Sequence, residues 1–551
     1  MDTVKSTLFN KYLRSKLHAM STVIDYKNKD IKTKLNLEID SRIEKLRSNR
    51  ELSISGGGQK RIDDQHAKGK LTARERIDHL IDSGSFEEIG MLMRTSMSDT
   101  KVGESQYLGD SVITGYATIN NKKIFIFSQD FTVLGGTISE VSATKICKVM
   151  DLAANSGVPI IGLFDSGGAR IQEGVSSLIG CGEIFTRNTL YSGVIPQISV
   201  IMGPCAGAAT YSPALTDFIF MVNKTGQMYI TGPVVLKAVT GEEVSAEESG
   251  GSDIHSTKAG NCHFTYNSEQ ECLQMVRRLL SFLPQNNREK EKSKLDYEER
   301  DLLDGDILNV IPPDPNKSYD MNNIINKLID NSDFMEVQDK FGRSIIVGFA
   351  RLGGRSVGIV AQQPTYFAGA ITVDASDKAA RFIRFCDCFN IPIISLVDVP
   401  GYMPGTEQEY QGIIRHGAKL LFAYAEATTI KISVIVRKAY GGAFIAMGSK
   451  SLRGDINYAW PSAELAVMGP EGAINIIHRN QLEKSGSDEL RRTLLKEYRD
   501  TFANPYIAAG KGYIDDVIDP RETRYKLIRA LKTLEEKSVQ NPWKKHGNIP
   551  L

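Results

Sequence analysis

Apolar and polar residues follow one succession twice along the chain, first from Ser111 and again from Ser344. In each stretch, two apolar runs rich in β-branched and aromatic residues flank a polar or glycine turn. This alternation predicts a β-hairpin in both places.

A predicted helix and a predicted strand follow each hairpin. Apolar residues recur at i, i+3, i+4 and i+7, which predicts an amphipathic helix. These residues are Ile146, Val149, Met150 and Ala153 in the first stretch and Ala379, Phe382, Ile383 and Cys386 in the second. The apolar runs that end in Asp165 and Asp398 predict strands covered on both faces.

The same order of elements recurs over far more residues than the roughly 20 to 50 of a solenoid repeat, so we predict a tandem duplication of one α/β domain. The charged and then proline-rich segment 284–320 has little to bury and marks the boundary between the copies. The expected organisation is an N-terminal helical extension (1–50), a first domain (51–290), a linker (291–320), a second domain (321–540) and a tail (541–551).

Turns of small residues follow predicted strands in both copies. They are "DSGGAR" (165–170), "PCAGAA" (204–209), "VPGYMPG" (399–405) and "AYGGA" (439–443). Glycine lets a ligand approach the main chain and lets successive N–H groups point the same way. We expect "SGGARIQEG" to lead directly into a helix, whose first N–H groups lack partners. One such loop is more often structural, but four at equivalent places favour two sites for negative charge on oxygen.

Composition narrows the classes of function. Lys and Arg number 67 against 66 Asp and Glu, a net charge of +1, so no basic field indicates nucleic acid or a membrane surface. The 7 Cys form no C-x-x-C pair and the 8 His show no ligand spacing, so we expect no metal site. The chain contains neither a P-loop nor a G-x-S-x-G elbow, and no apolar run approaches the roughly 18 to 20 residues of a membrane helix.

The opening of the chain, residues 6–21, is basic and mildly amphipathic. A plain N-terminal helix is the favoured interpretation, and a mitochondrial targeting segment is the alternative. We therefore expect a cytoplasmic protein, with the mitochondrial matrix as the second possibility.

Longer phrases resemble a known family. They include "DSGGARIQEGV" (165–175), "DVPGYMPGTEQE" (398–409), "RKAYGGAFIAMGSK" (437–450) and "NYAWPSAELAVMGPEGA" (457–473). Together they are similar to the carboxyltransferase (β) subunit of biotin-dependent acyl-CoA carboxylases of the propionyl-CoA carboxylase type. The resemblance implies two crotonase-like (ClpP-like) ββα superhelix domains in tandem. It also implies a homohexamer, a dimer of trimers, with each active site between the first domain of one subunit and the second domain of another.

The resemblance implies that a carboxyl group passes from N1-carboxybiotin, on a separate carrier protein, to the α-carbon of an acyl-CoA. Biotin carboxylase and biotin carboxyl carrier subunits are the implied partners, because the sequence shows neither a biotin-attachment Met-Lys-Met nor an ATP-grasp region. If CO2 is released in the site, the ureido anion can remove the α-proton and no protein base is needed. Two oxygen anions then need stabilising.

By the same resemblance, Gly167 and Gly168 hold the thioester oxygen, while Gly442 and Ala443 hold the ureido oxygen. Substrate contacts are expected from a further set, namely Ala206, Gly207, Ala208 and Ile445. No metal is expected in this subunit.

Ile445 departs from the family pattern, because propionyl-CoA carboxylases typically carry Asp at this place. An apolar residue also occurs in the carboxyltransferase subunits of methylmalonyl-CoA decarboxylases, so a subunit of such a decarboxylase is the alternative function. Core packing is an equally good interpretation of Ile445. A third hypothesis is a crotonase-like protein that serves only as an assembly core.

Overall fold

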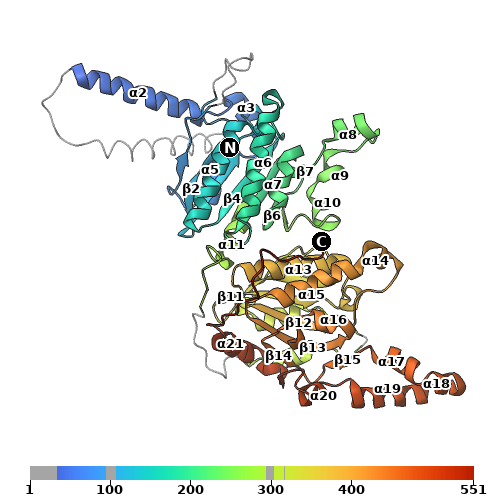
Figure 1. The fold of residues 1–551 in the computed structure, drawn as a ribbon. Helices are drawn as coiled ribbons and strands as arrows, with labels where there is room; N and C mark the ends of the chain where they lie inside the picture. The colour runs from blue at the N-terminus through green and yellow to red at the C-terminus, as the bar shows by residue number, and fades with distance from the viewer. Residues whose placement is uncertain (1–33, 95–106, 293–302, 316) are drawn as a thin grey trace. The chain divides into compact units, whose positions relative to one another are not determined.

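The computed structural model describes residues 34–94, 107–292, 303–315 and 317–551 (Figure 1). Helix α2 (Lys34–Ile54) belongs to a unit that ends at Ser55, and Gly56–Leu551 form a second unit. The predicted targeting or helical segment 6–21 lies outside the described residues. Among the described residues, no helix has the length and apolar character needed to cross a membrane.

The first sheet has eight strands in the order β1-β2-β3-β4-β5-β6-β8, with β7 paired to β5. The hairpin predicted from Ser111 is confirmed, because β2 and β3 pair antiparallel, and the following strands from β3 to β6 run parallel. The strands are β1 (Glu87–Ile89), β2 (Val112–Ile119), β3 (Lys122–Gln129), β4 (Ile160–Ser166), β5 (Gln197–Ala206), β6 (Phe218–Val222), β7 (Gln227–Tyr229) and β8 (Phe264–Tyr266).

The second sheet repeats the first strand for strand, in the order β9-β10-β11-β12-β13-β14-β16, with β15 paired to β13. Again a hairpin, β10 with β11, leads into parallel strands. The strands are β9 (Met335–Val337), β10 (Ile345–Leu352), β11 (Arg355–Gln362), β12 (Ile393–Val399), β13 (Lys431–Tyr440), β14 (Ile456–Ala459), β15 (Glu464–Ala466) and β16 (Asp516–Val517). The predicted duplication is therefore confirmed, whereas the exact domain boundaries stay predictions.

The two helices predicted from the apolar spacing are α5 (Glu140–Ser156) and α13 (Val373–Cys388). Each begins earlier than the apolar pattern, because a capped polar turn precedes it: the side chains of Ser139 and Thr372 accept N–H groups of the first helical turn. The apolar residues that define both patterns are buried. In each half a second helix packs on the first, α6 (Val175–Leu190) on α5 and α15 (Ile413–Glu426) on α13.

Further helices complete the second unit. They are α3 (Gln59–Ala67), α4 (Ala73–Leu80), α7 (Tyr211–Ala214), α8 (Pro233–Thr240), α9 (Ala246–Gly250), α10 (Ser252–Thr257), α11 (Glu269–Phe282), α12 (Asn322–Leu328), α14 (Thr406–Gln411), α16 (Gly441–Ala446), α17 (Pro470–Ile477), α18 (Arg479–Ser485), α19 (Asp488–Phe502), α20 (Pro505–Gly510) and α21 (Thr523–Thr533).

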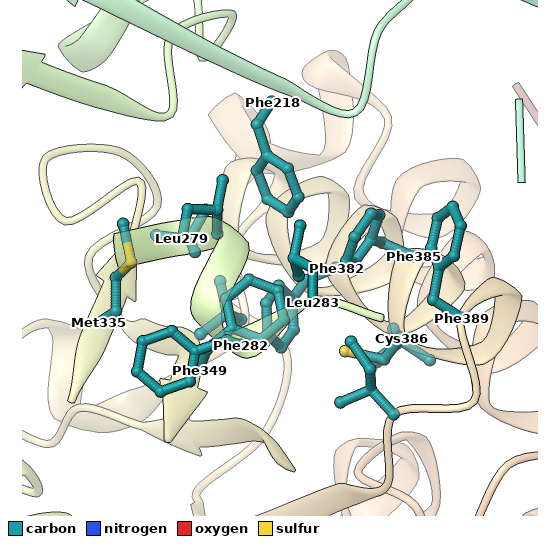
Figure 2. Close-up of a cluster of buried hydrophobic side chains, with 14 of the residues drawn as sticks. Phe218, Leu279, Phe282, Leu283, Met335, Phe349, Phe382, Phe385, Cys386 and Phe389 are labelled. Atoms are coloured by element: carbon teal, nitrogen blue, oxygen red, sulfur yellow. The ribbon is translucent and has the colours of Figure 1, made fainter. Parts of the chain in front are cut away.

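Aromatic residues join the two halves in one hydrophobic cluster (Figure 2). The ring of Phe218, from β6, lies 4.6 Å from that of Phe385 on α13 and 5.8 Å from that of Phe349 on β10. Such edge-to-face pairs add to the stabilisation that burial of the rings already provides. The glycine loops of both halves are thus carried by sheets that share a core.

Candidate active site

The first glycine loop of each half follows an equivalent strand, β4 or β12. The carbonyl of Gly168 accepts the N–H of Ile138 at 2.8 Å, and the carbonyl of Gly401 accepts the N–H of Ile371 at 3.1 Å. Gly168 has φ 103°, and a Cβ there would lie 2.8 Å from the carbonyl oxygen of Ala206. Only glycine fits both this conformation and this close approach.

The amides of the predicted pair Gly167 and Gly168 already have partners. The N–H of Gly167 donates to the Gly135 carbonyl at 2.9 Å, and the N–H of Gly168 donates to the Ser166 hydroxyl at 3.1 Å. In the second half Pro400 occupies the place of Gly167 and has no N–H to offer.

The expectation that "SGGARIQEG" leads directly into a helix is wrong. Arg170 donates its N–H to Ile138, which prolongs the extended backbone, and a 3-10 turn at Ile171–Glu173 precedes α6. The helix begins only at Val175. The loop therefore offers its glycine backbone but not the first turn of a helix.

The second loop of each half does lead directly into a helical turn. Gly207, with φ 60°, starts a 3-10 turn after β5, and Gly441, with φ 61°, starts α16 after β13. Ala208 and Gly442 therefore hold matching positions. The first N–H groups of such a turn have no acceptor within it, so this is where each half can offer main-chain donors to a ligand.

Each half brings its predicted site residues together, because the strands that carry them are neighbours. Ser166 pairs with Cys205, which places the Gly167 loop beside Ala206 and Gly207, and Val399 pairs with Ala439 in the second half. Ile445 is 40% exposed, and Tyr211, at the matching position of the first half, is 48% exposed. Ile445 is thus a partly open side chain one turn beyond the predicted donors.

Two charged networks that the sequence did not predict lie next to these loops. The buried carboxylate of Asp165 receives Lys70 Nζ at 2.8 Å from Oδ1 and 2.7 Å from Oδ2, while Arg76 Nη1 lies 2.9 Å from Oδ2. The buried carboxylate of Asp398 accepts bonds from Arg437 Nε at 3.0 Å and from the Tyr319 hydroxyl at 2.9 Å. The aspartates were visible as strand ends, but their partners lie far away along the chain.

Burial shapes the protonation of these partners. Burial lowers the pKa of the Lys70 amine below its usual value, although the attraction of Asp165 opposes this effect. Burial, reinforced by the negative charge of Asp398, raises the pKa of the Tyr319 hydroxyl well above its usual value. Tyr319 therefore keeps its proton and donates it in a hydrogen bond.

A groove of about 470 Å³ lies between α5 and α6 and includes Ala143, Cys147, Val175, Ile179 and Arg187 in its lining. None of the four glycine loops contributes to it. In the described part of the chain, no group of three or more His, Cys, Asp or Glu residues is placed to hold a metal ion.

Known proteins similar to this chain include carboxyltransferases. The family model for the carboxyl transferase domain matches residues 64–549. The propionyl-CoA carboxylase beta chain of Roseobacter denitrificans is 54% identical over 509 residues, which is 92% of this chain and 99% of the relative. The propionyl-CoA carboxylase carboxyltransferase subunit of Haloferax mediterranei is 53% identical over 516 residues, 94% of this chain and 100% of the relative.

A third relative is named as a decarboxylase subunit. The methylmalonyl-CoA decarboxylase subunit alpha of Propionigenium modestum is 51% identical over 512 residues, 93% of this chain and 99% of the relative. Among solved structures, the hexameric transcarboxylase 12S core with methylmalonyl-coenzyme A and methylmalonic acid bound superposes with a TM-score of 0.90. It is 45% identical and covers 96% of this chain and 100% of that chain.

Proposed function

Because this chain belongs to the carboxyl transferase domain family, we propose that it transfers a carboxyl group from N1-carboxybiotin on a carrier protein to the α-carbon of a short acyl-CoA. It is a biotin-dependent acyl-CoA carboxyltransferase of the propionyl-CoA carboxylase β type. The expected fold, two crotonase-like α/β domains in tandem, is confirmed. The observation that carries the proposal is the repetition of the glycine loops at equivalent strand ends of both halves.

The chain's own contribution is a set of main-chain donors. On the acyl-CoA side the proposed site residues are Gly167 and Gly168, with Ala206, Gly207 and Ala208 beside them. Because the N–H of Gly167 is bonded to the Gly135 carbonyl, this glycine stabilises the loop. The turn that begins at Gly207 supplies the main-chain N–H donors to the thioester oxygen. Donors about 2.7 to 3.1 Å from a developing oxyanion stabilise it most effectively.

On the biotin side, Gly442 and Ala443 are the proposed donors to the ureido oxygen. Apart from its own helical turn, no atom of the chain lies within 4 Å of the position that a Cβ at Gly442 would take, so no other part of the chain covers this turn. Bound carboxybiotin would supply both the carboxyl group and the base. The chain would orient the two substrates and stabilise negative charge on oxygen, so no side chain has to act as a base.

The assembly is also part of the proposal. The related transcarboxylase core is a hexamer, and we expect this chain to form a homohexamer, a dimer of trimers, whose sites combine the two halves of different copies. Strongly exposed apolar residues such as Val175 and Ile179 on α6 and Ile414 on α15 support burial between copies. Biotin carboxylase and carrier subunits would be the partners, in the cytoplasm as expected for relatives from bacteria and archaea.

The direct test is carboxyl transfer by the purified full chain. Carboxylated carrier protein is mixed with acetyl-, propionyl- or butyryl-CoA, and the carboxylated acyl-CoA is quantified by chromatography. Transfer to at least one of these thioesters is expected. Absence of transfer to all three, from a carrier shown to be carboxylated, would refute the proposal and favour the assembly-core hypothesis.

The decarboxylase relative supports a second candidate, in which the transfer runs from a carboxylated acyl-CoA to biotin. The residue Ile445 is compatible with it. Co-purification from the native source separates the two: a biotin carboxylase subunit indicates the carboxylase, and a multi-span membrane subunit indicates the decarboxylase.

Replacement of Ile445 by Asp tests its contact with the acyl group. Asp has a smaller side chain and is typical of propionyl-CoA carboxylases at this place, so the preference for propionyl- over acetyl-CoA should rise about tenfold in kcat/KM, within the range expected for one methylene. The control is Ile445→Leu, which keeps the volume and the apolar character and should leave the ratio unchanged. An unchanged ratio in the Asp variant would mean that Ile445 serves packing alone.

A further inference from the structure

The strand ladder slips at the same place in both halves, and a buried aspartate stands at each slip. Between β4 and β5 the pairing passes from Phe164 with Ile201 to Ser166 with Cys205, so residues 202–204 stand opposite Asp165 alone. A slip of this kind leaves main-chain groups without ladder partners and bends the strand.

The second half shows the same slip between β12 and β13. Here the pairing passes from Val397 with Ile435 to Val399 with Ala439, so residues 436–438 stand opposite Asp398. In each half the aspartate therefore sits at the point where the longer strand departs toward its glycine turn.

In the second half the carboxylate replaces the missing ladder bonds. Oδ1 of Asp398 accepts the N–H of Lys438 at 3.0 Å, and Oδ2 accepts Arg437 Nε at 3.0 Å and the Tyr319 hydroxyl at 2.9 Å. The N–H of Asp398 donates to Gln362 Oε1 at 3.1 Å. The carboxylate is fully buried, so these groups alone determine its orientation.

The first half lacks both strand-borne donors. Gly203 stands in the place of Arg437 and Pro204 in the place of Lys438, so there is neither a guanidinium nor an N–H. A Cβ at Gly203 would lie 1.9 Å from Asp165 Oδ1 and 2.6 Å from Lys70 Nζ. The absence of a side chain therefore opens the space that another cation fills.

Residues before the first sheet supply what β5 lacks. Lys70 Nζ reaches Oδ1 of Asp165 at 2.8 Å, Arg76 Nη1 lies 2.9 Å from Oδ2, and Gln65 Nε2 donates to Oδ2 at 2.8 Å. Each aspartate thus has a hydrogen-bond donor at one carboxylate oxygen and a guanidinium beside the other. The two halves take these groups from different parts of the chain. Gln129 accepts the Asp165 N–H as Gln362 accepts that of Asp398.

We propose that Asp165 and Asp398 are positioning residues that set the glycine loops of the acyl-CoA side and of the biotin side, respectively. The assignment of sides rests on the proposed function. Neither carboxylate is exposed, so neither touches substrate. Asp165 precedes Gly168 in the same loop, while Asp398 ties the loop of Gly401 to the strand that delivers Gly441. A buried charge held by several partners resists displacement, because loss of any partner leaves it uncompensated.

The test compares Asp398→Asn with Asp165→Asn in the full chain, with free biotin and a carboxylated acyl-CoA as substrates. The amide keeps the shape of the carboxylate but turns an NH2 group toward a donor. Asp398→Asn should raise the KM for biotin about tenfold and leave the KM for acyl-CoA within about twofold, and Asp165→Asn should do the reverse. A general loss of stability would raise both KM values or neither.

A milder pair covers the case in which an Asn variant does not fold. Tyr319→Phe removes one neutral donor from Asp398 and should raise the KM for biotin by about two- to threefold. Gln65→Leu removes one from Asp165 and should raise the KM for acyl-CoA by the same factor. Equal changes in both KM values, or none in either pair, would overturn the positioning role. If the effects separate but with the two substrates exchanged, the positioning role stands and the assignment of sides in the proposed function fails.

Discussion

Replacing Gly442 with proline is expected to lower kcat for carboxyl transfer by about 10²- to 10³-fold, the usual cost of losing one oxyanion donor. Gly442 is the second residue of α16, where the fixed φ of proline is tolerated and the N–H has no acceptor in the helix. The substitution therefore removes the proposed donor and little else. Steady-state kinetics measures the loss, and thermal unfolding should remain close to that of the unmodified chain.

The control is Gly442→Ala, which keeps the N–H. The added methyl group meets no atom within 4 Å outside its own helical turn, and the matching position of the first half is already alanine, Ala208. Its kcat should stay within about threefold of the starting value, since backbone donors do not depend on the side chain. If the proline variant transfers carboxyl groups as well as the alanine variant, Gly442 does not stabilise an anion.

Replacing Glu269 with alanine is expected to lower the free energy of unfolding by about 3–5 kcal/mol, because it leaves a buried guanidinium without one of its two carboxylates. Glu269 receives Arg76 Nε at 2.9 Å and Nη2 at 2.7 Å, and the two side chains are only 3% and 0% exposed. It also accepts the N–H of Leu71 at 3.2 Å. Denaturant unfolding at a fixed protein concentration measures the change.

An exposed ion pair provides the comparison. Glu483 meets Arg479 at 2.9 Å, but their side chains are 63% and 75% exposed. Glu483→Ala should therefore change the free energy of unfolding by no more than about 1 kcal/mol, as is usual for surface pairs. A Glu269 variant as stable as the Glu483 variant would show that the Arg76 network contributes nothing to stability.

The sequence was sufficient to predict the duplication, the hairpins, the main helices and the positions of the glycine turns. These features depend on local patterns: apolar spacing sets α5 and α13, and small residues mark the strand ends at Gly168 and Gly441. The tandem fold and the family followed from the same residues and are confirmed.

What the sequence did not predict depends on contacts between distant residues. The acceptor of the Gly167 N–H is the carbonyl of Gly135, in another loop, and no local pattern announces it. The same holds for Lys70 and Arg76, which reach Asp165 from before the first sheet. One signal was available: the aligned copies place Gly203 opposite Arg437, and a buried aspartate that loses its strand-borne cation needs another.

The difference at Gly203 and Arg437 makes the two halves unequal as building blocks. A hybrid chain assembled from two second halves would carry its arginine with each copy, whereas one assembled from two first halves would also have to repeat residues from α3 onward to supply Gln65, Lys70 and Arg76. Replacing Gly203 with arginine, the residue found at position 437, would not remove the need for this upstream segment, because the new side chain would collide with Asp165 while Lys70 remains in place. Any exchange of modules in this scaffold has to move the upstream helices and the first sheet as one piece.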